Sequence, residues 1–178
     1  MACRWAVLTL ACVLLGASLS AAPALTAQGV LQRIQKDGAS RTLDRLYASE
    51  GAWSQVLRGV RTGSAGWVEV ARALKAQGGP SAPELTAALA DALAVAPERV
   101  LGALGREFDA DDVCSLNTLE DTLGESYAAA LGKVQARRKA VGAVKREGLG
   151  VQRDECLGFL EELEREVERN RTEWFPKP

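Results

Sequence analysis

The amino-acid sequence predicts an all-α fold: a single-domain array or bundle of about seven helices, with stacked helix–turn–helix units and one disulfide. Apolar residues recur at positions i, i+3, i+4 and i+7 over most of the chain, which is the period of an amphipathic helix. Short segments rich in glycine, proline and serine separate these stretches. Nowhere do apolar and polar residues alternate for long enough to indicate a half-buried strand.

Residues 25–108 are expected to form short stacked helices. The segments 25–38 and 39–51 predict two of them, broken at Gly38 and Gly51. Four apolar stripes with helical spacing follow: Trp53, Val56, Leu57 and Val60; Trp67, Val70, Ala71 and Leu74; Leu85, Ala88, Leu89, Ala92 and Leu93; and Val100, Leu101 and Leu104. The Trp53 and Trp67 stretches form a weak internal repeat, so residues 43–104 are interpreted as stacked helix–turn–helix units.

Residues at the turns between these stripes indicate where helices begin. Ser64 is a candidate N-cap between the two tryptophan stretches. Ser81 and Glu84 have the spacing of a capping box, in which two side chains bind each other's backbone N–H groups. Pro97 fits the first turn of a helix, where its missing N–H loses no hydrogen bond.

Residues 109–178 predict a short turn, two longer helices and a tail. Asp109 is a candidate N-cap for the turn that carries Cys114. The first long helix is expected at about 119–145, and its apolar side consists of Leu119, Leu123, Tyr127, Leu131 and Val134. The second is expected at about 151–172, and its core-facing side consists of Cys156, Leu160, Leu163 and Val167.

Residues 1–24 have the pattern of a secretory signal peptide cleaved after Ala24. A charged start at Arg4 precedes an apolar run that ends at Leu19, and small residues follow. The run is shorter than the roughly 20 apolar residues of a membrane span, so no integral membrane segment is expected after cleavage. An uncleaved anchor is the alternative, and lipoprotein cleavage before Cys12 fits less well because it would divide the apolar run. The expected location is the periplasm or the cell exterior.

Cleavage would remove Cys3 and Cys12 and leave Cys114 and Cys156 as a pair in an oxidising compartment. A Cys114–Cys156 disulfide is the favoured interpretation, and closing this loop would stabilise the fold by up to roughly 4 kcal/mol in the chain-entropy model. The alternatives are a thiolate nucleophile and a zinc site. The first lacks a base and the second lacks ligands, because the chain contains no histidine.

Composition argues against several classes of function. The formal net charge is −1, from 22 basic and 23 acidic residues, so no general attraction to nucleic acid or anionic membranes is expected. The sequence contains no phosphate loop, nucleophile elbow, metal motif or serine–histidine arrangement. The acidic stretch at 109–120 lacks the central glycine of a calcium loop. No cofactor, metal or catalytic residue is therefore assigned.

Two sets of residues are candidate contacts for a partner. Arg137, Arg138 and Lys139 lie in the one basic cluster, which would bind an acidic partner or a phosphate, or simply form a solvated helix face. Trp174 and Phe175 follow the last helix and would either pack onto the core or form an exposed aromatic contact. Along that helix, ion pairs are expected for Glu161–Arg165, Glu166–Arg169 and Glu168–Arg171.

Several of these elements together resemble a group of small exported helical proteins of proteobacteria with no assigned function. The shared-looking elements are Trp53, the turn from Gly59 to Trp67, Pro97 with Val100 and Leu101, and the "DVC" at 112–114. The resemblance covers about residues 43–160. It implies export and an all-helical fold, and it carries no catalytic residues across.

The function expected is that of an exported, non-catalytic helical protein that binds a protein partner in the cell envelope. The alternative is an envelope ligand-binding protein or chaperone-like carrier, and a carboxylate-dependent hydrolase is third. A concave row of exposed apolar residues around Trp67 and Leu74 would favour the first. A closed apolar cavity would favour the second, and two buried carboxylates that face each other would favour the third.

Overall fold

The computed structural model describes residues 25–76, 81–115 and 126–175, and within these residues the chain forms helices and no strands. This confirms the all-α prediction. The helices number ten in these segments, against the seven expected, because short turns such as α6, α7 and α10 are separate elements. They are α1 (Ala27–Asp37), α2 (Ala39–Ala48), α3 (Ala52–Arg61), α4 (Ala65–Lys75), α5 (Ser81–Ala92), α6 (Pro97–Leu101), α7 (Ala110–Cys114), α8 (Tyr127–Gly142), α9 (Gly150–Arg169) and α10 (Arg171–Trp174).

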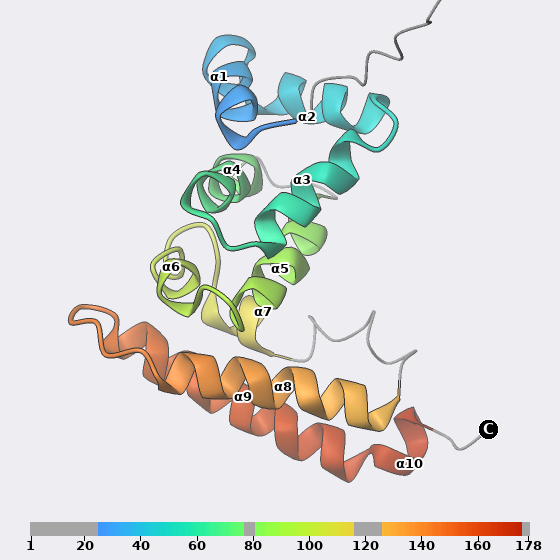
Figure 1. Cartoon of the computed structure of the whole chain (residues 1–178), viewed down its shortest axis with the longest axis vertical. Coiled ribbons are helices and arrows are strands. Elements are labelled where there is room, and N and C mark those ends of the chain that lie inside the picture. Colours follow the sequence, from blue (N-terminus) through green and yellow to red (C-terminus); the bar gives the residue numbers. More distant parts are fainter. Residues whose placement is uncertain (1–24, 77–80, 116–125, 176–178) are drawn as a thin grey trace, which may run out of the picture.

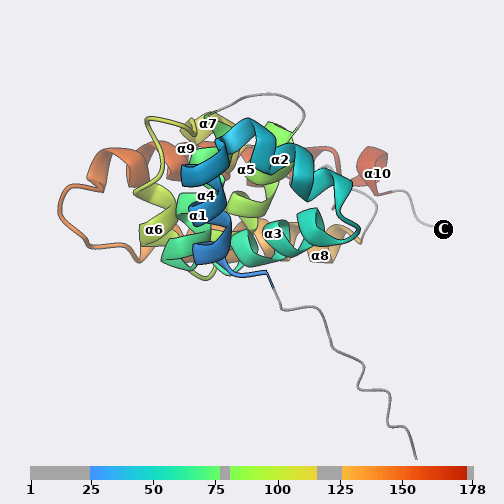
Figure 2. The ribbon, with the colours of Figure 1, turned by 90° about the horizontal axis from the view of Figure 1, so that it is seen from above.

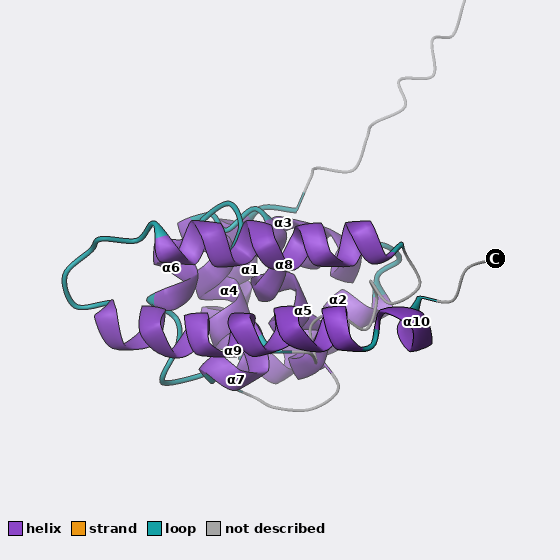
Figure 3. Ribbon diagram, turned by 90° about the horizontal axis from the view of Figure 1, so that it is seen from below, coloured by secondary structure: helices purple, strands orange, loops and turns teal. Residues whose placement is uncertain are grey.

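The helices stack along the longest axis of the molecule (Figure 1). The pair α1 and α2 covers one end, as the view from above shows (Figure 2), and α3 to α7 form the middle. Helix α1 packs on α4, α3 packs on α5, and α7 packs on α9. The hairpin of α8 and α9 crosses the other end, where its two helices run side by side (Figure 3). We call α1 to α7 the array and α8 to α10 the hairpin.

The predicted breaks between helices are confirmed where glycine or proline sets them. Gly38 and Gly51 separate the first three helices with φ angles of +86° and +71°, a region that other residues adopt only with strain. Pro97 occupies the first turn of α6. Ser64 and Asp109 precede α4 and α7 as N-cap residues by position, but neither side chain makes a capping hydrogen bond.

The array packs around its predicted apolar stripes, and the α3–α4 contact is especially close. Val56, Val60 and Leu74 are fully buried. The indole of Trp67 lies directly over Gly59, so closely that a Cβ atom at residue 59 would come within 2.4 Å of the ring. Glycine is therefore needed at residue 59 for this packing.

The hairpin follows the prediction in α9 and departs from it in α8. Cys156, Leu160, Leu163 and Val167 are all buried, as expected, although α9 ends at Arg169 rather than Thr172. The buried side of α8 is Ala130, Val134, Arg137 and Val141. Val134 is thus buried as predicted, whereas Tyr127 and Leu131 are only partly buried against the core. Leu119 and Leu123, at the expected start of this helix, lie outside the described residues.

A disulfide joins Cys114 at the end of α7 to Cys156 in α9, with Cα atoms 5.4 Å apart. Both cysteines are fully buried. The predicted pairing is confirmed, and it fastens the hairpin covalently to the array. No helix in the described segments is both long and apolar enough to cross a membrane. The predicted signal peptide at 1–24 lies outside the described residues.

Candidate partner-binding surface

Arg137, Arg138 and Lys139 are consecutive on α8, so their side chains leave the helix at successive steps of about 100°. The sequence grouped them as one basic cluster. The structure separates them: Arg137 faces the array, Arg138 faces α9, and Lys139 faces outward. Their possible roles as partner contacts therefore differ.

Arg137 does not lie on an exposed face, which corrects the prediction, because only 2% of its side chain is exposed. Its Nη2 donates to Oδ1 of Asp91 on α5 at 2.7 Å, and Nε of Arg61 on α3 donates to the other oxygen of that carboxylate at 3.1 Å. Burial lowers the pKa of Arg137, and the charge of Asp91 and its hydrogen bond oppose this shift. Arg137 thus joins the hairpin to the array and is inaccessible to an external partner.

Arg138 faces the second helix of the hairpin. Its Nη1 lies 2.6 Å from Oε2 of Glu164 on α9, while Nε2 of Gln135 donates to Oε1 of the same carboxylate at 2.9 Å. Glu164 is only 8% exposed, so these two contacts give each of its oxygens a partner. Arg138 therefore holds α8 against α9.

The ion pairs along α9 also differ from those predicted. Arg165 pairs with Glu162 at 2.7 Å, and Arg169 approaches the same carboxylate at 3.9 Å. Arg171 makes no such pair within the described residues but lies over the ring of Tyr127, with its Cζ atom 4.4 Å from the ring centroid. The two ion pairs lie on the outside of the hairpin, where exposed ion pairs contribute little to stability.

Lys139 is exposed, and it lies one turn before Ala143 on the same helical face. Ala143 belongs to a hollow of about 330 Å³ between the start of α6 and the end of α8, which we call the α6–α8 hollow. Its lining consists of Val95, Ala96, Pro97, Glu98, Arg99, Ala140, Ala143 and Val144. The hollow was not predicted from the sequence.

The α6–α8 hollow combines an apolar floor with an exposed apolar edge. Ala96 and Val144 are 7% and 4% exposed, so they form part of the packed core, whereas Val95 is 68% exposed. The exposed large apolar side chains of the described segments are Tyr47 at 44%, Val95 at 68% and Val151 at 77%. Exposed apolar groups beside a concavity lined by small residues suit the insertion of an apolar side chain from a partner.

Several cations lie in or next to the α6–α8 hollow along the chain. Lys139 lies before it on α8, and the exposed residues Lys145 and Arg146 directly follow Val144. Arg99 lines it and donates from Nη1 to the carbonyl oxygen of Gly63 at 3.1 Å. Glu98 and Glu147 contribute two negative charges, so the cations outnumber the anions around the rim.

Trp174 and Phe175 pack onto the molecule, which is the first of the two alternatives considered for them. Both are half-buried and lie against the apolar core. The Phe175 ring meets the Tyr127 ring edge-on, with centroids 5.9 Å apart. This contact attaches α10 to the start of α8, so the tail stabilises the open end of the hairpin.

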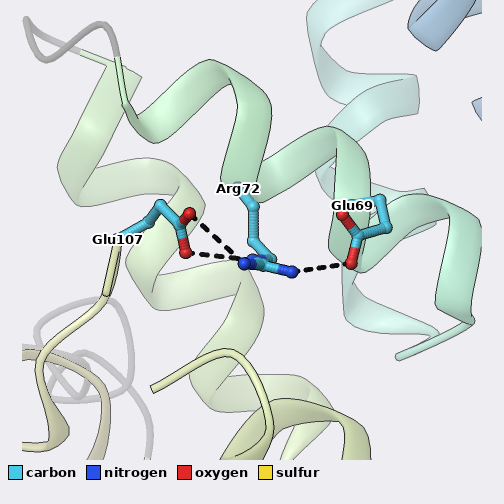
Figure 4. A network of polar contacts seen from close by, with 3 residues as sticks. All are labelled: Glu69, Arg72 and Glu107. Carbon is cyan, nitrogen blue, oxygen red and sulfur yellow. Dashed lines mark hydrogen bonds and ion pairs between the residues drawn. The ribbon is translucent and has the colours of Figure 1, made fainter. Parts of the chain in front are cut away.

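An ion-pair network of three residues lies on the array (Figure 4). Arg72 on α4 donates from Nε and Nη2 to the two oxygens of Glu107 at 2.9 and 3.3 Å, and from Nη1 to Glu69 at 2.9 Å. These hydrogen bonds lower the pKa of Glu107 and raise that of Arg72. General acid–base catalysis needs a pKa near the working pH, so this arrangement suits cross-linking of α4 to the segment before α7.

Glu84 has a partner set different from the predicted capping box. Its Oε2 accepts hydrogen bonds from Nε1 of Trp53 at 2.7 Å and from the hydroxyl of Tyr47 at 2.9 Å. Ser81 Oγ has no hydrogen-bond partner. Burial, followed by the hydrogen bond and charge of Glu84, raises the pKa of Tyr47 to about 12. The carboxylate thus connects α5 to α2 and α3.

Two of the three features that would separate the candidate functions, the exposed apolar row and the facing carboxylates, are not found in the described segments. Leu74 is fully buried and Trp67 packs against Gly59, so these residues do not form the exposed apolar row that would have favoured protein binding. Glu164 is the one buried carboxylate in the described segments, so no facing pair of buried carboxylates exists there. Those segments also contain no group of side chains able to hold a metal ion. The exposed apolar concavity lies instead at the α6–α8 hollow.

Comparison with known proteins adds no relative: the chain matches no model of a protein family, no curated protein and no solved structure at a significant level.

Proposed function

We propose that this chain is an exported, non-catalytic helical protein that binds a protein partner in the cell envelope through the α6–α8 hollow. The observation that carries the proposal is the 68% exposed side chain of Val95 at the edge of an alanine-lined hollow. Protein interfaces concentrate their binding energy in a few apolar or aromatic side chains that fill such hollows.

The rim of the α6–α8 hollow indicates the chemistry of the partner. Lys139, Lys145 and Arg146 are exposed and adjoin the lining residues Ala140 and Val144 along the chain. A partner segment with one large apolar residue flanked by Asp or Glu complements this surface, since complementary charge speeds association and disfavours wrong partners. The partner class is therefore an acidic protein segment with an apolar anchor.

Two observations support export. Residues 1–24 have the order of charged, apolar and small segments that signal peptides share. Structural disulfides such as Cys114–Cys156 are typical of oxidising compartments. Cleavage near Ala24 would place the mature protein in the periplasm or outside the cell.

Site-specific photo-crosslinking in cells that naturally make the protein tests the proposal. A photoreactive amino acid at residue 143, inside the hollow, should give one dominant crosslinked protein. The matched control is residue 128, because Ala128 and Ala143 are both exposed alanines at opposite ends of α8. A crosslink of equal yield at residue 128 would mean that the hollow is not the binding surface.

A second substitution shows whether the apolar edge is required. Val95→Glu should reduce the crosslink from residue 143 by about tenfold or more, because it puts a charge where the partner's apolar anchor packs. Val95 is largely exposed, so the thermal unfolding midpoint should stay within a few degrees of the wild type. An undiminished crosslink in this variant would contradict the proposal.

A further inference from the structure

A second hollow, at the opposite end of the molecule, has a different chemistry. It lies between α1, α2 and the start of α3, with a volume of about 480 Å³. We call it the basic hollow, and its lining consists of Arg33, Lys36, Asp37, Arg45, Leu46, Ala48, Ser49 and Ala52. Three cationic side chains from two helices thus converge on one concavity.

The positive charge of the basic hollow is only partly neutralised. Arg45 forms an ion pair with Asp37, and this contact uses the single carboxylate of the lining. Arg33 and Lys36 are both exposed, and neither makes an ion pair or side-chain hydrogen bond within the described parts of the chain. They lie three residues apart on α1, so they share one helical face. Two positive charges therefore remain available in the hollow.

The floor of the basic hollow is apolar. Leu46 is 2% exposed and belongs to the core, and Ala48 and Ala52 add two small side chains. Ala52 begins α3, whose N-cap residue Gly51 offers no side chain to its first turn. The positive end of that helix adds to the field of the cations. The hollow therefore joins an anion-attracting rim to an apolar surface.

We propose that the basic hollow binds a phosphate ester, with its phosphate between Arg33 and Lys36 and its organic part against Leu46 and Ala52. A phosphate monoester carries close to two negative charges at neutral pH, which matches the two available cations. Arginine binds phosphate oxygens through paired N–H donors, and lysine adds a compact charge. The net charge of the whole chain is −1, so this attraction is local to the hollow and not a property of the entire surface.

The first experiment titrates glycerol 3-phosphate into the purified, ¹⁵N-labelled protein and follows the backbone amide signals by NMR. Saturable shifts should concentrate at residues 33–37 and 48–54, and glycerol alone should cause none. Absence of a saturable shift in these segments would overturn the proposal.

Matched charge-removing variants test whether the hollow itself is the site. The double variant Arg33→Gln/Lys36→Gln should weaken binding about tenfold or more, because it removes both charge-assisted contacts. The control Lys145→Gln/Arg146→Gln also removes two exposed positive charges, at the other end of the molecule, and should leave the affinity within about twofold. Equal weakening in both variants would mean general charge attraction rather than a site.

Vesicles distinguish the two sources of such a phosphate. Co-sedimentation with vesicles that contain phosphatidic acid, whose headgroup is a phosphate monoester, lost in Arg33→Gln/Lys36→Gln and kept in the control, would identify a lipid headgroup. Binding of glycerol 3-phosphate without co-sedimentation would identify a soluble phosphate ester. Co-sedimentation that survives in both double variants would contradict the headgroup source. The crosslink from residue 143 should be unaffected by Arg33→Gln/Lys36→Gln, so failure of phosphate binding and failure of partner binding are separable.

Discussion

The array and the hairpin achieve their packing in different ways. In the array, the glycines at helix contacts touch their neighbours: a Cβ atom on Gly59 would come within 2.4 Å of Trp67, and one on Gly63 within 2.3 Å of Ala96. In the hairpin helices, Gly132 and Gly158 have no atom within 4 Å of such a position. The array is closely packed at these helix contacts, whereas parts of the hairpin helices face open space.

The two regions also differ in what they bury. The buried charged side chains of the described segments, Arg137 and Glu164, both belong to the hairpin. The contact between hairpin and array contains a disulfide and an ion pair in addition to apolar packing. The hairpin is therefore attached at a few strong points, while stability in the array is spread over many small contacts.

The disulfide should have the largest effect. The variant Cys114→Ala/Cys156→Ala should lose about 2–4 kcal/mol of unfolding free energy, mainly because the unfolded chain gains the entropy of an open loop. Guanidinium denaturation of the two proteins measures the difference. Alkylation under non-reducing conditions provides the check, because two reactive thiols in the native mature protein would show that the bond does not form.

Arg137 should have the next largest effect. Arg137→Ala should cost about 3 kcal/mol, the lower end of the range for a broken buried ion pair, because Asp91 stays 40% exposed and keeps Arg61 as its partner. Arg137→Met retains most of the side-chain volume and should cost markedly less, since apolar replacement of buried ion pairs is often nearly neutral. The exposed neighbour supplies the control: Lys139→Ala should stay within about 0.5 kcal/mol of wild type.

The burial of Arg137 is a feature that could not be predicted from the sequence. The helical periods of the array and of α9 are local patterns, and the two cysteines that the expected cleavage would leave can pair in one way, so these features were predictable. In a helical pattern of apolar and polar residues, an arginine is assigned to the exposed, polar side. Its burial depends on Asp91, which is 46 residues away along the chain. The sequence alone could not show that α8 turns this side inward.

The candidate site was harder to predict for the same reason. Val95 and Pro97 meet Ala140 and Ala143 only after the hairpin docks on α6, and small residues give no distinctive signal. Lys139 was identified from its charge. Trp174 and Phe175 were correctly recognised as able to pack on the core, because apolar residues just past a helix commonly do so.

Because α3 is closely packed at Gly59 and α8 is open at Gly132, the same glycine-to-alanine substitution should change the unfolding free energy in opposite directions at these two positions. Gly59→Ala should destabilise the protein by about 1–2 kcal/mol, because overpacking against Trp67 outweighs the gain in helix propensity. Gly132→Ala, in the open part of α8, should stabilise it by up to about 1 kcal/mol. Thermal unfolding of both variants measures the signs. A stabilised Gly59→Ala protein would refute the close packing of α3 on α4.

The smallest effect expected is that of the network around Arg72, and it should depend on pH. Arg72 lowers the pKa of Glu107 below its ordinary value of 4.5 in the folded protein. The resulting stabilisation is therefore fully present above that value and is lost as the pH falls through the lowered folded-state pKa. Glu107→Gln should reduce the unfolding free energy by at most about 1 kcal/mol at pH 7, and the difference from wild type should vanish at strongly acidic pH. Urea denaturation at pH 7 and at strongly acidic pH measures this difference in unfolding free energy.

Glu69→Gln removes the other, 56% exposed partner of Arg72, so its effect at pH 7 should be smaller than that of Glu107→Gln. A larger effect would mean that the exposed pair, rather than the bidentate contact to Glu107, holds α4 in place.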